Sequence, residues 1–146
     1  MKIVLVRSMG HAGRETNVTG IYPPLGLASL AAVIKKPGRE ISILDAEALG
    51  ISDKNLTAAI PDDPAIIGVT STTLAWPAVR RVSSALATRF PRAVLVVGGP
   101  HPTVFPKESL EASAFHVAVM GDGETSFARL VDRVEAGSLY DDIAGC

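Results

Sequence analysis

Five segments rich in apolar residues recur along the chain, and each stops at a polar or glycine-containing turn. They cover residues 2–7, 40–45, 65–70, 93–97 and 115–120. The segments at 65–70 and 93–97 carry little polar alternation, which is typical of parallel strands covered on both faces. The pattern therefore predicts five strands. The run AVLVVGGPHPT at 93–103 joins the fourth strand to two adjacent glycines and two prolines, which are expected to form a stiff exit loop.

Between these strands, apolar residues follow the helical period instead. One buried stripe is predicted in each of three helices, which follow Pro23-Pro24, span about 75–90, and run from about 124 to a closing Gly137. The stripes are Leu27, Leu30, Ala31 and Ile34; Val79, Val82, Leu86 and Phe90; and Phe127, Leu130, Val131 and Val134. Shorter helices are expected at 53–60 and 105–112. Residues 8–22 are expected to form a long loop, of a length that tends to be functional or mobile.

Strands that alternate with helices predict a doubly wound α/β fold. Right-handed crossovers give a five-stranded parallel sheet with helices on both faces. The common order for five strands is 2-1-3-4-5, with the switch point between strands 1 and 3. Four loops then meet at the carboxyl edge of the sheet, where ligands bind in such folds, at 7–24, 70–76, 98–103 and 121–124.

Composition and charge narrow the class of protein. The chain has 146 residues, enough for one domain, and its 47% apolar content and mean hydropathy of +0.30 exclude a disordered chain. A net charge of −1 gives no electrostatic reason to expect a nucleic acid or an anionic membrane as partner. No apolar run approaches the roughly 20 residues of a membrane span, and no signal peptide is evident, so a cytoplasmic protein is expected.

The cysteine count and the end of the sequence add two expectations. Cys146 is the one cysteine, which excludes an intrachain disulfide and any multi-cysteine metal site. No closing element follows the last helix pattern. We therefore expect a domain over residues 1–137, with 138–146 beginning a linker to a further domain outside this chain.

The predicted edge carries mild chemistry: glycines, hydroxyls, prolines, one His, one Asp and one Glu. It offers no convincing nucleophile–base pair, and it suits a large, mostly uncharged ligand held by backbone and packing. A flavodoxin phosphate loop fits poorly at 7–10, and a phosphorylation receiver would need an Asp where Thr70 stands. Gly121 and Gly123 supply only half of a dinucleotide motif, since Ser126 occupies the place of its last glycine.

Four blocks in register fit a different use of the fold: YPPLGLA at 22–28, GVTSTT at 68–73, GGPHPT at 98–103 and GDGE at 121–124. On these blocks the chain resembles the cobalamin-binding domain at the N-terminus of cobalamin-dependent radical SAM enzymes. The resemblance implies a flavodoxin-like fold that buries the nucleotide tail of the corrin along the switch point. It implies cofactor contacts from Pro24, Leu25, Thr70, Ser71, Thr72, Gly98, Gly99, Pro100, His101, Gly121, Asp122, Gly123 and Glu124.

One departure from related cobalamin domains bears on the cobalt. Methionine-synthase-like and mutase-like domains carry D-x-H-x-x-G after the first strand, with the His as lower cobalt ligand. Here Met9 precedes His11 where the Asp belongs, and Arg14 replaces the glycine. The resemblance then implies a cofactor without a histidine ligand from that loop. No catalytic residue is expected in this chain, because the iron–sulfur cluster of radical SAM chemistry needs a cysteine trio that a single cysteine cannot supply. S-adenosylmethionine and that cluster are therefore expected only in a further domain outside this chain, and no metal ligand is expected here.

Each candidate residue also has a plainer interpretation. His101 either contacts the corrin or cobalt, or it caps a loop. The pair Gly98-Gly99 either admits a ligand or makes a tight turn, and Thr70 to Thr73 are also explained as a cap of the next helix. Asp122 and Glu124 suit a helix N-terminus, and Trp76 either covers a ligand or packs on the sheet. Tyr22 and Leu25 either line a pocket or seat the first helix. His11 is expected to be solvated, and His116 is expected to mark a strand edge.

Three functions stay open at this point. The first is a cobalamin-binding module of a radical SAM enzyme that performs methyl transfer or related radical chemistry with a downstream catalytic domain. The second is a stand-alone cobalamin-binding sensor or methyl carrier that acts on a partner protein. The third is a structural α/β domain that has lost its ligand.

Overall fold

The computed structural model describes residues 1–8 and 22–146. It contains a five-stranded sheet in the order β2-β1-β3-β4-β5, and every neighbouring pair is parallel. The strands are β1 (Lys2–Arg7), β2 (Glu40–Asp45), β3 (Ile66–Thr70), β4 (Val94–Gly98) and β5 (Val117–Ala118). The predicted fold class, strand order and parallel pairing are confirmed. The expected loop at 8–22, with His11, falls mostly on residues 9–21, which lie outside the described part.

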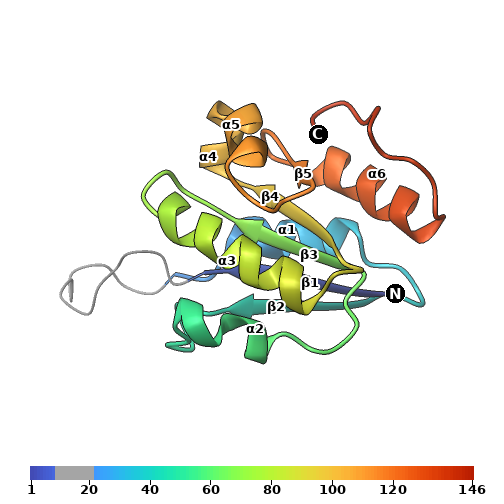
Figure 1. Ribbon diagram of the computed structural model, residues 1–146. Helices are drawn as coiled ribbons and strands as arrows, with labels where there is room; N and C mark the ends of the chain where they lie inside the picture. Colours follow the sequence, from blue (N-terminus) through green and yellow to red (C-terminus); the bar gives the residue numbers. More distant parts are fainter. Residues whose placement is uncertain (9–21) are drawn as a thin grey trace.

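Helices cover both faces of this sheet, as the pattern predicted (Figure 1). Leu5 and Val96 point to one face and pack with α1 (Leu25–Val33) and α6 (Glu124–Glu135). The alternating positions Val6 and Val97 point to the other face, with α2 (Leu56–Ala59) and α3 (Trp76–Arg89). A short 3-10 turn, η1 (Asp53–Asn55), precedes α2. Because side chains alternate along a strand, one sheet serves two separate cores.

The expected stiff loop after β4 is helical. Residues of this segment form α4 (Pro100–Val104), which is followed by α5 (Pro106–Glu111), and α5 confirms the short helix expected at 105–112. Proline is tolerated in the first turn of a helix, because the N–H that it lacks has no partner there. Each of these short helices begins at a proline, so the prolines start the helices instead of preventing them.

The fifth strand is shorter than the predicted 115–120. Only Val117 and Ala118 form ladder pairs with β4, although the N–H groups of His116 and Val119 still donate to carbonyls of β4. The Met120 N–H donates instead to the Gly145 carbonyl at 2.9 Å. This edge strand therefore ends early because the returning tail takes over its hydrogen bonding.

The tail expected to begin a linker packs on the domain. Ile143 is buried in the core under α6, and Tyr140 and Cys146 lie partly buried beside it. Arg133 of α6 donates to the Leu139 carbonyl at 2.9 Å. Residues 138–146 thus extend the α6 layer, while the domain limits at 137 stay a prediction.

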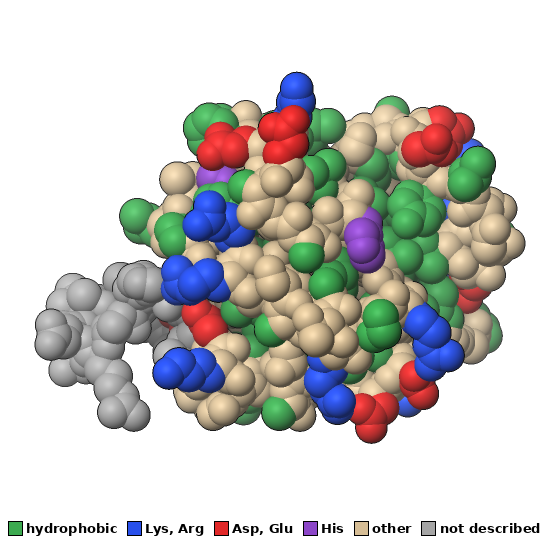
Figure 2. Space-filling model, viewed as in Figure 1, with side chains coloured by type: hydrophobic (Ala, Val, Ile, Leu, Met, Phe, Trp, Pro, Cys, Tyr) green, Lys and Arg blue, Asp and Glu red, His purple; other side chains and the backbone are tan. Residues whose placement is uncertain are grey.

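Charges are spread without a dominant sign on the surface in view. Figure 2 shows acidic and basic side chains interspersed over this face of the molecule. Among the residues described, all helices are too short or too polar to cross a lipid bilayer.

Candidate ligand-binding site

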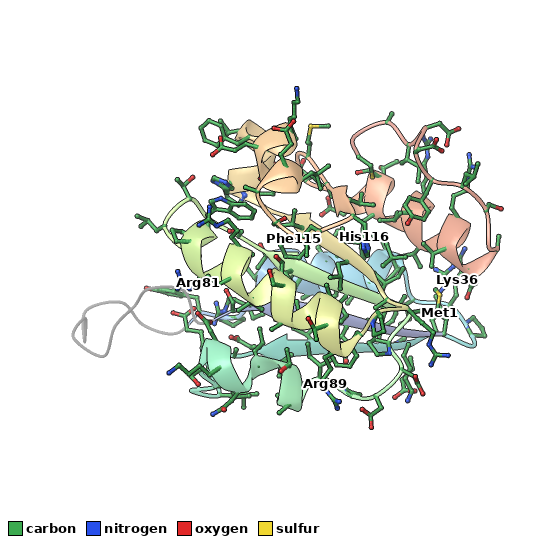
Figure 3. All side chains as sticks on the ribbon, in the orientation of Figure 1. Met1, Lys36, Arg81, Arg89, Phe115 and His116 are labelled. Carbon is green, nitrogen blue, oxygen red and sulfur yellow. The ribbon has the colours of Figure 1, made fainter. Side chains whose placement is uncertain are left out.

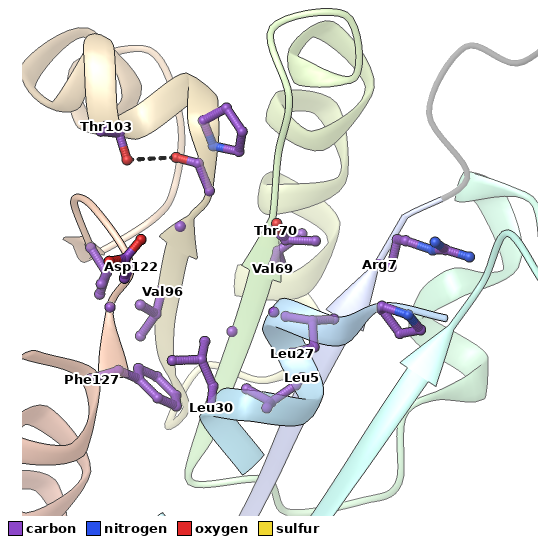
Figure 4. A pocket seen from close by; sticks show the side chains of 18 of the residues that line it. Leu5, Arg7, Leu27, Leu30, Val69, Thr70, Val96, Thr103, Asp122 and Phe127 are labelled. Carbon is purple, nitrogen blue, oxygen red and sulfur yellow. Dashed lines mark hydrogen bonds between the residues drawn. The ribbon is translucent and has the colours of Figure 1, made fainter. Parts of the chain in front are cut away.

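A cavity of about 590 Å³ opens at the carboxyl edge of the sheet, on the face covered by α1 and α6 (Figure 4). The ends of β1, β3 and β4, the start of α1 and the loop before α6 enclose it. This is the switch point of a 2-1-3-4-5 sheet, where the connections from β1 and β3 leave in opposite directions. The volume falls within the roughly 300–1,000 Å³ typical of small-molecule sites.

The floor of the cavity is apolar and depends on one glycine. Gly68 stands in the middle of β3 between Leu5 of β1 and Val96 of β4. A Cβ built on Gly68 would lie 3.1 Å from the Leu5 side chain and 3.7 Å from the Phe127 ring. Its partners Leu5 and Val96 carry side chains, whereas Gly68 contributes bare backbone to the cavity floor.

The mouth of the cavity is polar but carries little free charge. Thr70 and Thr72 bring hydroxyls from the end of β3, and Asp122 stands exposed on the opposite side. Arg7 lines the mouth, and its Nε and Nη2 each donate to the Asp45 carboxylate at 2.8 Å. Its Nη1 donates to the Tyr22 carbonyl at 2.8 Å, which holds the chain leading to α1. The guanidinium is therefore neutralised by a bidentate partner.

The loops after β3 and β4 are locked together by backbone. The Ser71 N–H donates to the Gly98 carbonyl at 2.9 Å, and the His101 N–H donates to the Ser71 carbonyl at 3.1 Å. Gly99 has a φ of +96°, and a Cβ there would lie 2.7 Å from the Thr70 hydroxyl. Only glycine fits this approach. The tight contact between loops thus accounts for Gly99, whereas Gly98 would meet nothing closer than 3.7 Å.

Thr103 ties the β4 loop to the β5 loop. Its hydroxyl donates to the Gly99 carbonyl at 2.8 Å (Figure 4) and accepts from the Gly121 N–H at 3.0 Å. Thr103 lines the cavity and was not among the predicted site residues. The available signal was that Thr103 ends the GGPHPT block; its spacing of four residues from Gly99 gains meaning only with α4, which the sequence did not predict.

Most of the residues predicted for the site meet at this cavity. Those that line it are Pro24, Leu25, Thr70, Thr72, Gly98, Gly99, Pro100, Gly121, Asp122 and Gly123. Ser71, His101 and Glu124 do not line it. Ser71 is buried, and its hydroxyl donates to the Thr72 carbonyl at 3.0 Å. Tyr22 and Leu25 are both exposed, and of the two only Leu25 is among the residues that line the cavity.

Glu124 connects two helices instead. The Ser29 hydroxyl of α1 donates to its carboxylate at 2.7 Å, which joins the start of α6 to α1. This hydrogen bond, assisted by backbone donation at the start of α6, lowers the pKa of Glu124 below its usual value. The residue therefore fastens the two helices that wall the cavity.

His101 turns away from the cavity toward α3. Its ring is buried and stacks on Trp76, with ring centroids 4.5 Å apart and an interplanar angle of 22°. Burial lowers the pKa of His101, and the nearby Glu108 carboxylate opposes that shift only in part. Trp76 belongs to the core on the α3 face and does not line the cavity, so its packing interpretation holds in this structure.

Sequence reasoning missed the apolar interior of the site and two polar lining residues, Arg7 and Thr103. The residues concerned are Leu5, Arg7, Gly26, Leu27, Leu30, Gly68, Val69, Val96, Thr103, Val119 and Phe127. Most of them belong to strands and helix stripes that also read as ordinary core. Gly68 was the detectable exception, because a glycine inside a buried strand marks a bulge or a close approach.

The chemistry of this cavity is that of binding. No histidine is among the residues that line it, and the described residues hold no cluster of three or more potential metal-ligating His, Cys, Asp or Glu side chains. An apolar floor, three threonine hydroxyls and bare glycine backbone suit a bulky group with few charges. The fold and the cavity together define a ligand-binding domain of the flavodoxin-like class.

Comparison with protein families identifies the class of ligand-binding domain. Residues 15–131 match the B12 binding domain family, so the chain belongs to that family. The expectation drawn from the four motif blocks is thereby confirmed. An uncharacterised methyltransferase of Pyrococcus horikoshii is 31% identical over 147 residues, which cover 99% of this chain and 32% of the relative. An anaerobic magnesium-protoporphyrin IX monomethyl ester cyclase of Synechocystis is 30% identical over 77% of this chain and 23% of its own length.

Solved structures share the fold. TsrM of Kitasatospora setae, a radical S-adenosylmethionine methyltransferase solved with cobalamin and a [4Fe-4S] cluster, superposes with a TM-score of 0.75 at 19% identity. The cobalamin-dependent radical enzyme OxsB superposes with a TM-score of 0.69 at 17% identity. This chain is covered to 99% in both cases, yet it spans only 26% and 20% of those proteins. It thus corresponds to about a third or less of its larger relatives.

Proposed function

We propose that this chain binds cobalamin, with the nucleotide appendage in the cavity at the switch point and the corrin ring outside it. The observation that carries the proposal is the apolar cavity over Gly68 at the carboxyl edge of the sheet. Its 590 Å³ accommodates an appendage but not a whole corrinoid, and its floor suits an aromatic base. The family match of the chain supports the identity of the ligand.

The residues around the cavity have separate roles in this proposal. Leu5, Val96 and Phe127 provide apolar contact for the base, while Thr70 and Thr72 offer hydroxyls to the polar linkage near the mouth. The backbone of Gly98 to Pro100 and of Gly121 to Gly123 lines the way out to the corrin. Cobalamin supplies a cobalt centre that can carry a methyl group. The residues of the chain hold the cofactor, orient it and shield it from solvent.

The larger relatives suggest what the module serves. They include a radical S-adenosylmethionine methyltransferase with cobalamin bound, and this chain spans a quarter or so of that protein. We therefore place the chain as the cobalamin module of a radical SAM enzyme, where a downstream catalytic domain or partner protein performs methyl transfer or related radical chemistry.

Hydroxocobalamin binding by the 146-residue chain tests the proposal. The protein is mixed with hydroxocobalamin and desalted, and the visible spectrum of the protein fraction is recorded. We expect the wild type to retain the corrinoid. Gly68→Val should weaken binding by roughly tenfold or more, because its methyl groups fill the floor beside Leu5 and Phe127.

A control separates binding from stability. Ala78→Val adds bulk to the fully buried start of α3, on the face of the sheet away from the cavity. It should lower stability yet retain hydroxocobalamin, with folding of each variant checked by circular dichroism. A wild type that retains none, or a folded Gly68→Val variant that binds as well as wild type, contradicts the proposed function.

A further inference from the structure

The His101 side chain is buried beside the cavity without taking part in its lining. It is 4% exposed and lies between two aromatic rings, Trp76 of α3 at 4.5 Å and Phe105 at 5.3 Å between centroids. Its Nδ1 lies 3.4 Å from the Thr73 hydroxyl. The ring thus fills the space between α4 and the start of α3.

Hydrogen bonding explains this position only in part, because the long contact of Nδ1 with Thr73 is the one side-chain hydrogen bond of the ring among the described residues. Nε2 is buried and has no hydrogen-bond partner within residues 1–8 and 22–146. A buried polar atom without a partner costs free energy, so shape and stacking contribute most to holding the imidazole here. Burial lowers the pKa of His101 against the smaller opposing effect of Glu108, and the ring is neutral at neutral pH.

The backbone of the same residue takes part in the hydrogen bonds that join the loop after β3 to the loop after β4, which we call the loop lock. The His101 N–H donates to the Ser71 carbonyl, Ser71 N–H donates to the Gly98 carbonyl, and the His101 carbonyl accepts from Phe105. Between these bonds Gly99 approaches the Thr70 hydroxyl with no room for a Cβ. Because the His101 ring packs against Trp76, it constrains the backbone segment that forms the cavity wall.

We propose that His101 is a positioning residue of the cobalamin site: its ring, packed between Trp76 and Phe105, sets the backbone of Gly98 to Pro100 that walls the cavity. The inference rests on the proposed function for its ligand, but the geometry stands without it. His101 acts through the glycine pair and does not contact the cofactor.

Three variants of the full chain test this role. His101→Ala removes the ring, and His101→Phe keeps a stacking ring while it removes both nitrogens. His116→Ala is the matched control, because His116 lies just before β5 and accepts a hydrogen bond from the Leu95 N–H, near the start of β4 (Figure 3). The control removes an imidazole and a hydrogen bond at the opposite end of the strands.

Two measurements are made on each variant. Amide hydrogen exchange of the protein alone reports the loop lock at Ser71 and at residue 101. Titration with hydroxocobalamin reports the site. For His101→Ala we expect exchange at both amides to rise about tenfold or more, and hydroxocobalamin affinity to fall by a similar factor. His101→Phe should keep both the amide exchange rates and the hydroxocobalamin affinity at wild-type values. His116→Ala should raise the exchange rate at Leu95 only.

The outcomes separate the two proposals. Unchanged exchange and affinity in a folded His101→Ala variant overturn the positioning role. A His101→Phe variant with native exchange but lost affinity also overturns it, since the imidazole would then contact the corrinoid directly. Loss of affinity in His116→Ala overturns it as well, because any destabilisation would have the same effect. A wild type that binds no hydroxocobalamin contradicts the proposed function, while the exchange data still decide the loop lock.

Discussion

The two faces of the sheet are built from the same kinds of strand residue but are filled differently. On the α3 face Val6, Val69 and Val97 meet Trp76 and Leu86, and the core closes up to the carboxyl edge. On the α1 and α6 face the matching row is Leu5, Gly68 and Val96, and a cavity lies over the bare backbone of Gly68. The glycine in the central strand is therefore one difference between the packed layer and the layer that holds the cavity.

The largest expected effect compares large-to-small substitutions on the two faces. Leu86→Ala on the closed face removes a fully buried side chain and should cost about 2–5 kcal/mol. Leu27→Ala, beside the existing cavity, should cost roughly half as much, since Leu27 already lacks neighbours on one side. Urea unfolding measures both. Equal costs would contradict the difference in packing between the faces.

The loop after β4 lies where the two faces of the sheet meet, and substitutions at its two glycines should have the next largest effect. Gly99→Ala should destabilise by about 1–3 kcal/mol, because its positive φ and the 2.7 Å approach to Thr70 leave no place for a methyl group. Gly98→Ala should stay within about 0.5 kcal/mol of wild type, since its nearest neighbour would lie 3.7 Å away. Thermal unfolding of the pair decides the point, and a harmless Gly99→Ala would remove the proposed loop lock.

A smaller effect is expected at the rim of the open face. Thr103→Val keeps the shape but removes the hydrogen bonds to Gly99 and Gly121, which should cost about 1 kcal/mol. Because the two loops border the cavity, hydroxocobalamin affinity should fall together with stability. Unchanged affinity would show that the Thr103 bridge does not shape the site. Thr125→Val, on the exposed first turn of α6 and outside the cavity lining, is the control.

The smallest effect is a pH dependence from the closed face. Because burial lowers the folded pKa of His101, the unfolded chain takes up the proton first as the solution is acidified. The free energy of unfolding should therefore fall below pH of about 6.5, and continue to fall until the folded pKa is passed. The difference between wild type and His101→Phe, measured by urea unfolding at several pH values, isolates this residue. A difference that does not vary with pH would contradict the prediction.

The strand and helix patterns of the sequence predicted most of the fold. Continuous apolar runs identified the parallel strands, and the periodic stripes of α1, α3 and α6 are buried or half-buried as expected. Prolines misled the prediction after β4, because a proline that stiffens a loop and one that opens a helix look alike in sequence. The short β5 was also beyond the pattern, since the tail around Gly145 replaces its hydrogen bonds.

The site was predictable at its mouth and not at its floor. Glycines and hydroxyls after strand ends pointed to the loops, and most of those residues do line the cavity. Leu5 and Phe127 gave no signal, because an apolar residue beside a cavity and one inside a core follow the same period. His101 lay in the right loop, but the direction of its ring depends on Trp76, which is 25 residues away in the sequence and on another layer.

The bidentate pairing of Arg7 with Asp45 has a consequence for selectivity. A cation at the mouth that is already matched by a carboxylate attracts free phosphate or sulfate only weakly. Recognition of the ligand then depends on its shape and on apolar contacts. These are insensitive to ionic strength, unlike the attraction between exposed charges. The domain should thus bind small anions only weakly, which leaves the mouth of the cavity open to a bulky organic ligand.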